Sequence, residues 1–336
     1  MIEEAIHLLS TKGNLSYKMT KGVMDEIMTG KASEVQISSY LTGLAIKGET
    51  IDEITGSAAG MRKHCIKLLN DQPVLEIVGT GGDKANTFNI STTSSIVISA
   101  AGIPVAKHGN RASSSKCGSA DVIEALGANL NISPEKSKYI LDELGFCFLF
   151  AQNYHIAMKF VAPVRKELAI RTIFNIIGPL ANPAGASMQV LGVYDESLVK
   201  PMAEVLSNLG VTKGMVVYGN CGLDELSISS ETTVCNINDG QFEEYTITPE
   251  RFGLEKSRKE DLVGGTPSEN AKITMEILEG KKGPRRDAVL LNAGAAIHVA
   301  RPELSFEDSI KLAEETIDNG LAYSQLQKFI KLTKEV

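Results

Sequence analysis

The spacing of hydrophobic residues in the first 70 positions predicts helices and no strand. Leu41 is followed by Leu44 and Ala45 at intervals of three and four residues, which is the spacing of one face of an α-helix. The segments 33–36 and 50–53 read Ser-Glu-Val-Gln and Thr-Ile-Asp-Glu, and both fit a capping box that begins a helix. We therefore expect a small, entirely helical N-terminal part.

From Val74 onward the pattern changes to short apolar runs that alternate with helical segments. The run 74–78 is rich in β-formers, ends in a glycine loop, and is followed by a helical pattern from Ser91. Further strands are expected near 103–107, 147–151, 188–194 and 214–219, and helices near 119–126, 134–144, 155–169 and 198–209. Short buried strands separated by helices predict a largely parallel sheet that is covered on both faces.

The remaining pattern completes an α/β fold of two domains. Asn-Asp-Gly at 238–240 predicts a hairpin at a sheet edge. Helical periodicity then returns at 268–278, at 288–300, and in two helices after Ser305 that are separated by Asn319-Gly320. We expect a small all-helical domain at 1–71 and a large α/β domain at 72–336, whose mostly parallel central sheet is flanked by helices. A helical segment near 160–183 is expected to join the small domain.

Composition narrows the class of protein. The 336 residues carry 34 basic and 41 acidic side chains, a net charge of −7, which disfavours a basic nucleic-acid-binding module. The five cysteines are scattered and never form C-x-x-C, so neither a disulfide framework nor a zinc site is indicated. No apolar run reaches the roughly 18 residues of a membrane helix, and acids stand where a signal peptide has bases. We expect a cytoplasmic protein without a membrane span.

Candidate chemistry begins at the glycine loop 79–83, Gly-Thr-Gly-Gly-Asp, directly after the first strand. Its N–H groups can converge on an anion, and Asn-Ile-Ser-Thr at 89–92 then begins a helix whose free N–H groups also favour phosphate. The pattern is neither a dinucleotide fingerprint nor a P-loop. A plain strand-to-helix turn with Ser91 as N-cap explains the loop equally well.

A second loop, 107–121, follows the next strand. It carries three cations, four serines and an asparagine within fifteen positions, a set of donors that suits a polyphosphate. The alternative is a solvated polar loop in which Ser119 caps the helix that starts near Asp121. Two such loops after successive strands favour a binding function, because the binding crevice of an open α/β sheet lies beyond the carboxyl ends of its strands.

Two further segments have functional and structural explanations. Asp224-Glu225 follows the strand 214–219, and adjacent carboxylates on such a loop suit Mg²⁺, although acidic pairs are usually solvated surface. Arg165 and Arg171 could bind a carboxylate bidentately. The segment 171–183 also contains helix-breaking Gly-Pro and Asn-Pro steps, which are equally typical of a junction between domains.

Five motifs occur together and in a characteristic order: G-T-G-G-D, N-I-S-T, K-H-G-N-R-x-x-S-S, G-S-A-D and R-T-I-F-N-x-x-G-P-L-x-N-P. Over essentially the whole chain this pattern resembles the anthranilate phosphoribosyltransferase family of tryptophan biosynthesis. The resemblance implies transfer of phosphoribose from phosphoribosyl pyrophosphate to the anthranilate amine, with pyrophosphate leaving. It also implies two Mg²⁺ ions and a homodimer formed through the helical domain, with no nucleic-acid or membrane partner.

The resemblance also implies the site residues. Lys107, Asp224 and Glu225 would be catalytic, and the metal ligands would be Ser91, Asp224 and Glu225. Phosphoribosyl pyrophosphate would contact Gly79, Gly82, Asp83, Thr87, Asn89, Ile90, Ser91, Thr92, Lys107, Asn110, Arg111, Ser113, Ser114, Ser115 and Ser119. Anthranilate would contact Gly79, His108, Asn110, Arg165 and Gly178, with Arg165 as the partner of its carboxylate.

Cys117 departs from the family pattern, where a small residue such as serine is usual, and would be prone to oxidation if exposed. Two other functions remain open at this point. One is a related pyrimidine-nucleoside phosphorylase, which also handles ribose and phosphate; the other is a non-catalytic relative that binds nucleic acid. The long motif that begins at Arg171 and the pair Asp224-Glu225 favour the transferase.

Overall fold

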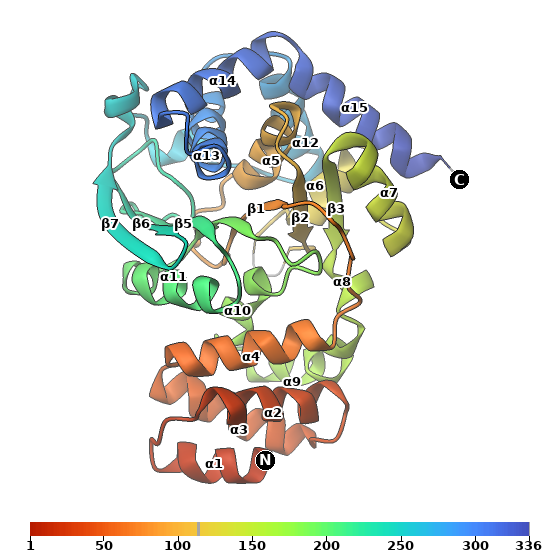
Figure 1. Ribbon diagram of the computed structural model, residues 1–336, viewed down its shortest axis with the longest axis vertical. Helices are drawn as coiled ribbons and strands as arrows, with labels where there is room; N and C mark the ends of the chain where they lie inside the picture. The colour runs from red at the N-terminus through yellow and green to blue at the C-terminus, as the bar shows by residue number, and fades with distance from the viewer. Residues whose placement is uncertain (113–114, 336) are drawn as a thin grey trace.

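The computed structural model describes residues 1–112 and 115–335 and has the expected α/β architecture with a small helical part (Figure 1). Helices α1 (Ile2–Ser10), α2 (Tyr17–Met28), α3 (Glu34–Lys47) and α4 (Ile51–Lys63) form a separate layer at the N-terminal end of the molecule. Both predicted capping boxes are present: the Ser33 and Thr50 side chains accept hydrogen bonds from the N–H groups of Gln36 and Glu53. The helical prediction for this region is confirmed.

The large part is built on a seven-stranded sheet in the order β3-β2-β1-β4-β5-β6-β7. The strands are β1 (Leu75–Gly79), β2 (Val105–Gly109), β3 (Phe146–Phe150), β4 (Met188–Gly192), β5 (Lys213–Gly219), β6 (Thr232–Asn238) and β7 (Gln241–Ile247). The first five run parallel, while β6 and β7 are antiparallel and form the predicted edge hairpin. Asp239 and Gly240 both have positive φ in its turn, which suits a two-residue hairpin.

Helices cover both faces of the sheet. The helices after β1 are α5 (Ile90–Ala100), α6 (Ser119–Ala125), α7 (Pro134–Leu144), α8 (Ala151–Tyr154), α9 (Ala162–Leu168), α10 (Phe174–Ile177), α11 (Val199–Asn208), α12 (Pro267–Leu278), α13 (Pro284–Ala300), α14 (Phe306–Asp318) and α15 (Leu321–Lys334). Of these, α9 packs against α3 of the small helical layer and not on the sheet. One core packs Leu75 and Ile77 of β1 against α5 and α13. A second core runs from Leu191 of β4 through α11 into the small helical layer, and a third, smaller core includes Ala106 and Leu149.

Two predicted helices differ from the structure. The single helix expected at 155–169 is divided into a 3₁₀ segment, Ile156–Phe160, and α9. Pro163 lies in the first turn of α9, where its missing N–H costs least, so a new helix begins there. For the same reason α13 begins at Pro284 rather than at the predicted Ala288.

The small helical layer is held to the large part by buried polar contacts as well as by apolar packing. Arg62 at the end of α4 donates from Nε to the carbonyl oxygen of Leu180 at 2.5 Å and from a terminal nitrogen to that of Leu209 at 2.7 Å. In residues 1–112 and 115–335 no helix combines the length and apolarity needed to cross a bilayer.

Candidate active site

The Asp224-Glu225 loop lies against the loop that leaves β1 and against the start of α5. The N–H of Gly81 donates to Oδ2 of Asp224 at 2.6 Å, and the N–H of Ser91 donates to Oε1 of Glu225 at 3.2 Å. Gly79 and Gly192, at the ends of neighbouring strands β1 and β4, permit this approach: a Cβ at Gly79 would overlap the Asp224 carboxylate, and one at Gly192 would overlap the Asp224 backbone. The acidic pair is therefore part of the crevice rather than solvated surface.

Negative charge is concentrated in this crevice. Burial raises the pKa of Asp224 well above its usual range, and the nearby Asp83 and Glu225 carboxylates raise it further. Burial likewise raises the pKa of Glu225 to about 7, although Lys107 and Ser91 oppose the shift. Oδ2 of Asp83 is buried without a hydrogen-bond partner. Mutually repelling carboxylates with an unpartnered oxygen fit a hard divalent cation, which prefers oxygen ligands.

The protein alone does not supply a complete ligand set for such a cation. Among the residues that the structure describes, no three His, Cys, Asp or Glu side chains converge as a metal cluster. A cation held by Asp224 and Glu225 would therefore need the Ser91 hydroxyl, water or ligand oxygens in addition. This is the usual situation for Mg²⁺, which keeps few protein ligands and binds substrate phosphate.

Lys107 is buried beneath the crevice, with 1% of its surface exposed. Its Nζ donates to the carbonyl oxygen of Ile77 at 2.6 Å and lies 3.5 Å from the Ser91 hydroxyl. Burial lowers the pKa of Lys107, while the charges of Glu76 and Glu225 oppose that shift. The ammonium group thus stands at the first turn of α5, next to helix N–H groups that also favour an anion.

The start of α5 is held by contacts from distant segments. The helix begins at Ile90 with Asn89 at the N-cap, so the expected capping role of Ser91 is wrong; the N–H of Ser91 is instead bound by Glu225. Asn89 donates to the carbonyl oxygen of Cys117 at 3.2 Å and accepts from Asn270 at 2.9 Å. Thr92 is buried in the first turn of the helix. The N-terminal end of α5 is thus fixed from two sides.

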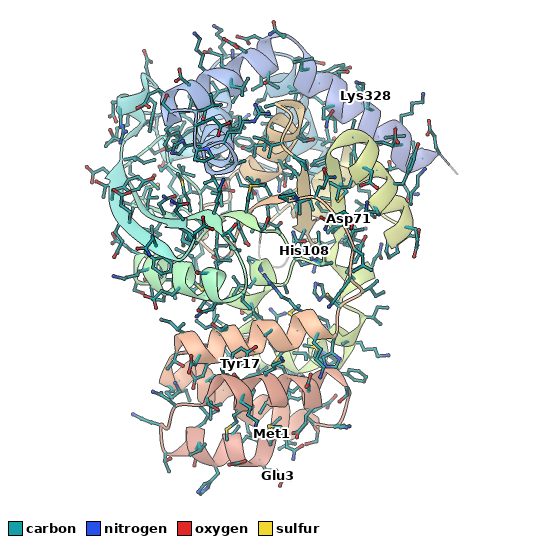
Figure 2. All side chains as sticks on the ribbon, in the orientation of Figure 1. Met1, Glu3, Tyr17, Asp71, His108 and Lys328 are labelled. Atoms are coloured by element: carbon teal, nitrogen blue, oxygen red, sulfur yellow. The ribbon has the colours of Figure 1, made fainter. Side chains whose placement is uncertain are left out.

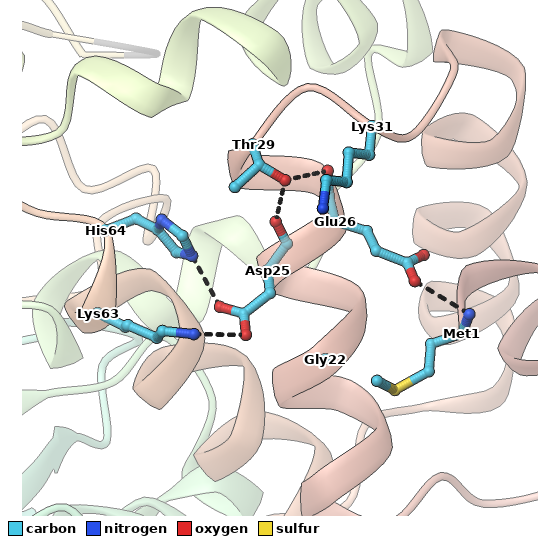
Figure 3. A pocket seen from close by; sticks show the side chains of 8 residues that line it. All are labelled: Met1, Gly22, Asp25, Glu26, Thr29, Lys31, Lys63 and His64. Carbon is cyan, nitrogen blue, oxygen red and sulfur yellow. Dashed lines mark hydrogen bonds and ion pairs between the residues drawn. The ribbon is translucent and has the colours of Figure 1, made fainter.

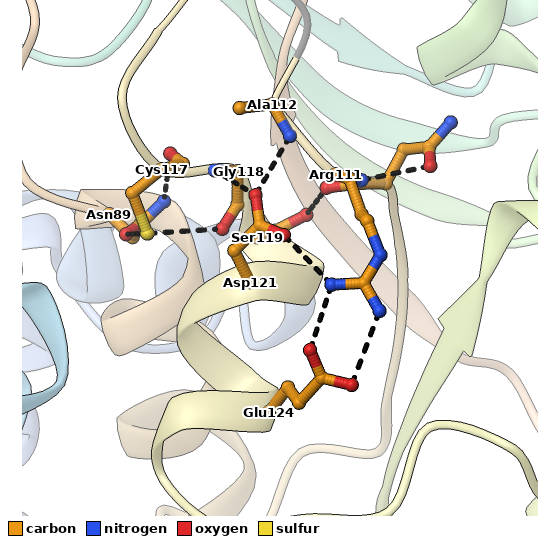
Figure 4. A network of polar contacts seen from close by, with 9 residues as sticks. Asn89, Arg111, Ala112, Cys117, Gly118, Ser119, Asp121 and Glu124 are labelled. Atoms are coloured by element: carbon orange, nitrogen blue, oxygen red, sulfur yellow. Dashed lines mark hydrogen bonds and ion pairs between the residues drawn. The ribbon is translucent and has the colours of Figure 1, made fainter. Parts of the chain in front are cut away.

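Asp121 organises the second candidate loop (Figure 4). Its Oδ2 accepts the N–H groups of Ala112 and Gly118, each at 2.9 Å. The helix begins at Ser119 after Gly118 at the N-cap, so the expected Ser119 cap is wrong, and the Asp121 carboxylate closes the helix end instead. The guanidinium of Arg111 binds Asp121 at 3.0 Å and Glu124 at 2.8 Å, so its charge is directed at this helix.

Other described residues of the loop 107–121 form hydrogen bonds within it. Asn110 accepts the Ala120 N–H and the Ser119 hydroxyl at its carbonyl oxygen, and Ser115 donates to the Cys117 carbonyl oxygen. Ser113 and Ser114 lie outside the described residues. Cys117 is 6% exposed, and burial raises the pKa of its thiol to about 11. The exposure that would have made Cys117 prone to oxidation is therefore absent.

A less polar surface, the histidine wall, is formed by His108, His155 and Gly178. It lies on the side of the sheet that faces the helical layer, where His108 is labelled in Figure 2. The rings of His108 and His155 are 5.0 Å apart, and both Nε2 atoms are buried without a partner. Burial lowers the pKa of His108 well below its usual value and that of His155 to about 4, so both rings are neutral near pH 7. Sequence reasoning missed His155, which belongs to no recognisable motif.

Gly178 and Arg165 complete the description of this wall. No heavy atom lies within 4 Å of the position of a Cβ at Gly178, so there is open space beside its backbone. The guanidinium carbon of Arg165 lies 5.4 Å from the Phe174 ring centroid, on α10, which leads directly into Gly178. Neutral rings suit a flat acceptor, and a guanidinium suits a carboxylate that such an acceptor carries.

A third segment, 262–265, which no motif marks, packs against residues 86–88 just before α5. Thr87 pairs with Val263 in an isolated antiparallel bridge, and the N–H of Gly264 donates to the carbonyl oxygen of Asn86 at 2.9 Å. The glycine loop itself is contacted by the long motif, because the Gly82 carbonyl accepts from the Arg171 guanidinium. A Cβ at Gly264 would lie 2.8 Å from the Phe88 nitrogen, so only glycine permits this approach. The Gly264-Gly265 pair is the one sequence feature that could have indicated a close backbone contact here.

A hollow of about 270 Å³ in the helical layer is separate from this site (Figure 3). The Asp25 carboxylate in it binds Lys63 at 2.8 Å and His64 at 2.7 Å, and Glu26 binds the chain's amino group at 3.0 Å. Because these charges neutralise one another and none comes from a strand-end loop, the hollow is not part of the candidate active site.

The fold and the strand-end site define a glycosyltransferase with a helical bundle domain and an α/β domain. The family models described as "Glycosyl transferase family, helical bundle domain" and "Glycosyl transferase family, a/b domain" match residues 3–65 and 71–323. Curated proteins named anthranilate phosphoribosyltransferase are 65% identical in Methanobrevibacter smithii and 63% identical in Lachnoclostridium phytofermentans, each over 99% of both chains. The chain belongs to the anthranilate phosphoribosyltransferase family.

Solved structures of the same family have the same fold. The Thermus thermophilus enzyme superposes with a TM-score of 0.93 at 42% identity, covering 98% of this chain and 99% of that one. The Saccharomyces cerevisiae enzyme, solved in complex with PRPP and Mg, superposes with a TM-score of 0.92 at 29% identity, covering 100% and 98%.

Proposed function

We propose that this chain transfers the 5-phosphoribosyl group of phosphoribosyl pyrophosphate to the amine of anthranilate, releasing pyrophosphate, at the carboxyl ends of β1, β2 and β4. The product is N-(5-phosphoribosyl)anthranilate, an intermediate of tryptophan biosynthesis. The observation that carries this proposal is the contact of Asp224 and Glu225 with the Gly79–Asp83 loop and the first turn of α5. It joins an acidic cation site to an anion site, as a magnesium diphosphate ester requires.

On the phosphate side, the chain binds and orients the donor. Asp224, Glu225 and the Ser91 hydroxyl would hold magnesium, and the family resemblance implies two Mg²⁺ ions. When bound, the metal supplies positive charge that stabilises a departing pyrophosphate. The Lys107 ammonium and the α5 N–H groups favour the same negative charge. The remaining glycine-loop and serine-loop residues named from the resemblance would contact the phosphates and ribose.

On the acceptor side, the histidine wall binds anthranilate, and the amine of anthranilate is directed at C1 of the ribose. Arg165 would bind the carboxylate, and His108, Asn110, Gly79 and Gly178 would line the ring. An aromatic amine is uncharged and nucleophilic near pH 7, so positioning contributes more than a strong base. The reaction forms the N–C1 bond and breaks the C1–O bond to pyrophosphate, and the nitrogen then loses one proton. His108 Nε2, which lacks a protein partner, can accept a hydrogen bond there.

We further propose the assembly and location that the family resemblance implies. Residues 1–71 and 72–336 would be the two domains, with 160–183 as the joining segment. Two chains would associate through the helical domain in the cytoplasm. Val35 and Ile46 on α3 are 76% and 74% exposed, which supports a covered apolar surface there.

The direct test mixes the protein with Mg²⁺, phosphoribosyl pyrophosphate and anthranilate and follows the loss of anthranilate fluorescence. We expect turnover that depends on all three components. Folded protein that leaves the fluorescence unchanged would sink the proposal. Release of thymine from thymidine and phosphate would favour the phosphorylase instead, and a salt-dependent nanomolar DNA complex without turnover would favour a nucleic-acid-binding relative.

A further inference from the structure

Glu76 is a fully buried acid on the central strand β1, and neither the motifs nor the proposed chemistry accounts for it. Its side chain has no exposed surface. Strand pairing places it on the sheet face of Ala106 and Val78, among side chains that are otherwise largely apolar. A buried carboxylate costs several kcal/mol unless it is well paired, so an apolar residue would be the simpler choice for stability at this position.

The two carboxylate oxygens of Glu76 connect two separate segments of the histidine wall. Oε1 accepts the backbone N–H of His108 at 2.8 Å, and Oε2 accepts the side-chain amide of Asn182. Asn182 also donates to the carbonyl oxygen of Ala106 at 2.8 Å and accepts the N–H of Ala184 at 2.8 Å. One carboxylate thus joins the end of β2 to the loop 178–184.

Other contacts from the same sheet face hold the same loop. Gln189, which pairs with Glu76 across β1 and β4, donates to the carbonyl oxygen of Pro179 at 3.0 Å. The backbone of Gly178 acts on the His108 ring, and that of Ala181 on the His155 ring; each opposes the lowering of the pKa of that ring. The G-P-L-x-N-P stretch is therefore held by polar side chains of the sheet, and Glu76 is the member of this set that contacts both sides of the wall.

We propose that Glu76 is a positioning residue for the acceptor substrate. Through Asn182 it holds the loop 178–184 against His108 and so fixes the distance between these two parts of the histidine wall. This inference rests on the proposed function, because it assigns a role within that same site. Glu76 touches neither substrate. Its hydrogen bonds lie on the acceptor side, at His108 and Asn182. Its charge also opposes the lowering of the Lys107 pKa, so a variant that keeps this charge is needed to separate the two effects.

Glu76→Gln tests this role at nearly constant volume. The glutamine amide can accept only one of the two hydrogen bonds that Glu76 accepts. Its NH₂ group would face the other donor, either the His108 N–H or the Asn182 amide. We expect the anthranilate KM to rise about tenfold, as for the loss of one hydrogen bond to a charged group. The KM for phosphoribosyl pyrophosphate should change by a smaller factor, through loss of the Glu76 charge that acts on Lys107.

Asn182→Ser provides a second variant that leaves the His108 hydrogen bond of Glu76 in place, and it should show the same selective rise in the anthranilate KM. Gln325→Met is the matched control. Gln325 lies on α15, outside the site, and its buried amide donates to the Ser99 hydroxyl and to the Leu144 carbonyl oxygen. This control variant should lower the melting temperature without changing either KM.

Equal changes in both KM values, or a fall in kcat alone, would overturn the inference. So would failure of both site variants to fold while Gln325→Met folds, because Glu76 would then have a purely structural role. Inactive wild-type protein would refute the proposed function itself, whereas active wild type with an unaltered Glu76→Gln variant would refute only the role of Glu76.

Discussion

The backbone N–H of Gly81 donates a 2.6 Å hydrogen bond to Oδ2 of Asp224, a residue 143 positions away in the sequence. This contact joins the loop after β1 to the loop after β5, although β4 lies between these strands in the sheet. It is possible because the strand ends at Gly79 and Gly192 carry no side chains. The acidic pair reaches the phosphate loop through this arrangement, which is the basis of the predictions on metal use.

Neutralising the acidic pair should impair metal-dependent turnover. Asp224→Asn with Glu225→Gln keeps the volume and removes the charges that would hold Mg²⁺. We expect kcat/KM at a fixed magnesium concentration to fall by about 100-fold or more, with partial recovery as magnesium is raised. Asp239→Asn, in the exposed β6–β7 turn, is the control for loss of an acid. An unchanged magnesium dependence in the double variant would contradict the assignment.

Removing the Arg165 guanidinium should chiefly affect the acceptor. Hydrogen bonds to charged groups contribute about 1.5–3 kcal/mol, so Arg165→Ala is expected to raise the anthranilate KM by roughly 10- to 100-fold. Steady-state kinetics with each substrate varied in turn would measure this. Lys166→Ala, an exposed cation one position along α9, should leave both KM values unchanged. If both variants behaved alike, the carboxylate would bind elsewhere.

His155 should make the fold sensitive to acid. Burial lowers its pKa from 6.5 to about 4, so the unfolded chain binds a proton more readily than the folded one. This contribution to stability is complete above pH 6.5 and is lost as the pH falls toward 4, by about 3 kcal/mol in total at 1.36 kcal/mol per pKa unit. His155→Gln should therefore lose less stability than wild type over that range.

The measurement is urea unfolding between pH 4.5 and pH 7.5, comparing slopes of unfolding free energy against pH. His7→Gln, at an exposed position on α1, controls for removal of a histidine and should follow wild type. Parallel curves for wild type and His155→Gln would show that the buried ring does not contribute.

Charges on α3 should separate the proposed homodimer. Val35 and Ile46 lie eleven residues apart, about three helical turns, and so share one exposed face. We expect Val35→Glu with Ile46→Lys to halve the mass measured by light scattering without unfolding the chain. Leu321→Lys, which charges an exposed leucine on α15, should leave the mass unchanged. A dimer that survives the α3 substitutions would place the interface elsewhere.

Local sequence patterns predicted most elements of the fold for a physical reason. The capping boxes at Ser33 and Thr50, and the Asp239-Gly240 turn, are formed by hydrogen bonds or backbone preferences within a few residues, so composition and spacing reveal them. For Ser91 and Ser119, the helix-capping role that the sequence offered as the alternative to phosphate binding is wrong, because Asn89 and Gly118 are the N-caps. Glu225 binds the N–H of Ser91, and Asp121 binds the N–H of Gly118, so the first of these groups is satisfied by a residue far along the chain.

The sequence by itself determined the alternation of strands and helices, the glycine and serine loops, and the family pattern that suggested their chemistry. Only the tertiary structure decided which distant groups meet: Glu76 with Asn182 and His108, and the neutral pair His108–His155. Strand order determines these contacts, because β1 lies between β2 and β4 and receives side chains from segments far along the chain. Spacing in a sequence indicates which residues are neighbours within one strand or helix. The buried Glu76 carboxylate instead binds the next strand of the sheet and the loop 178–184, which are far from it in the sequence.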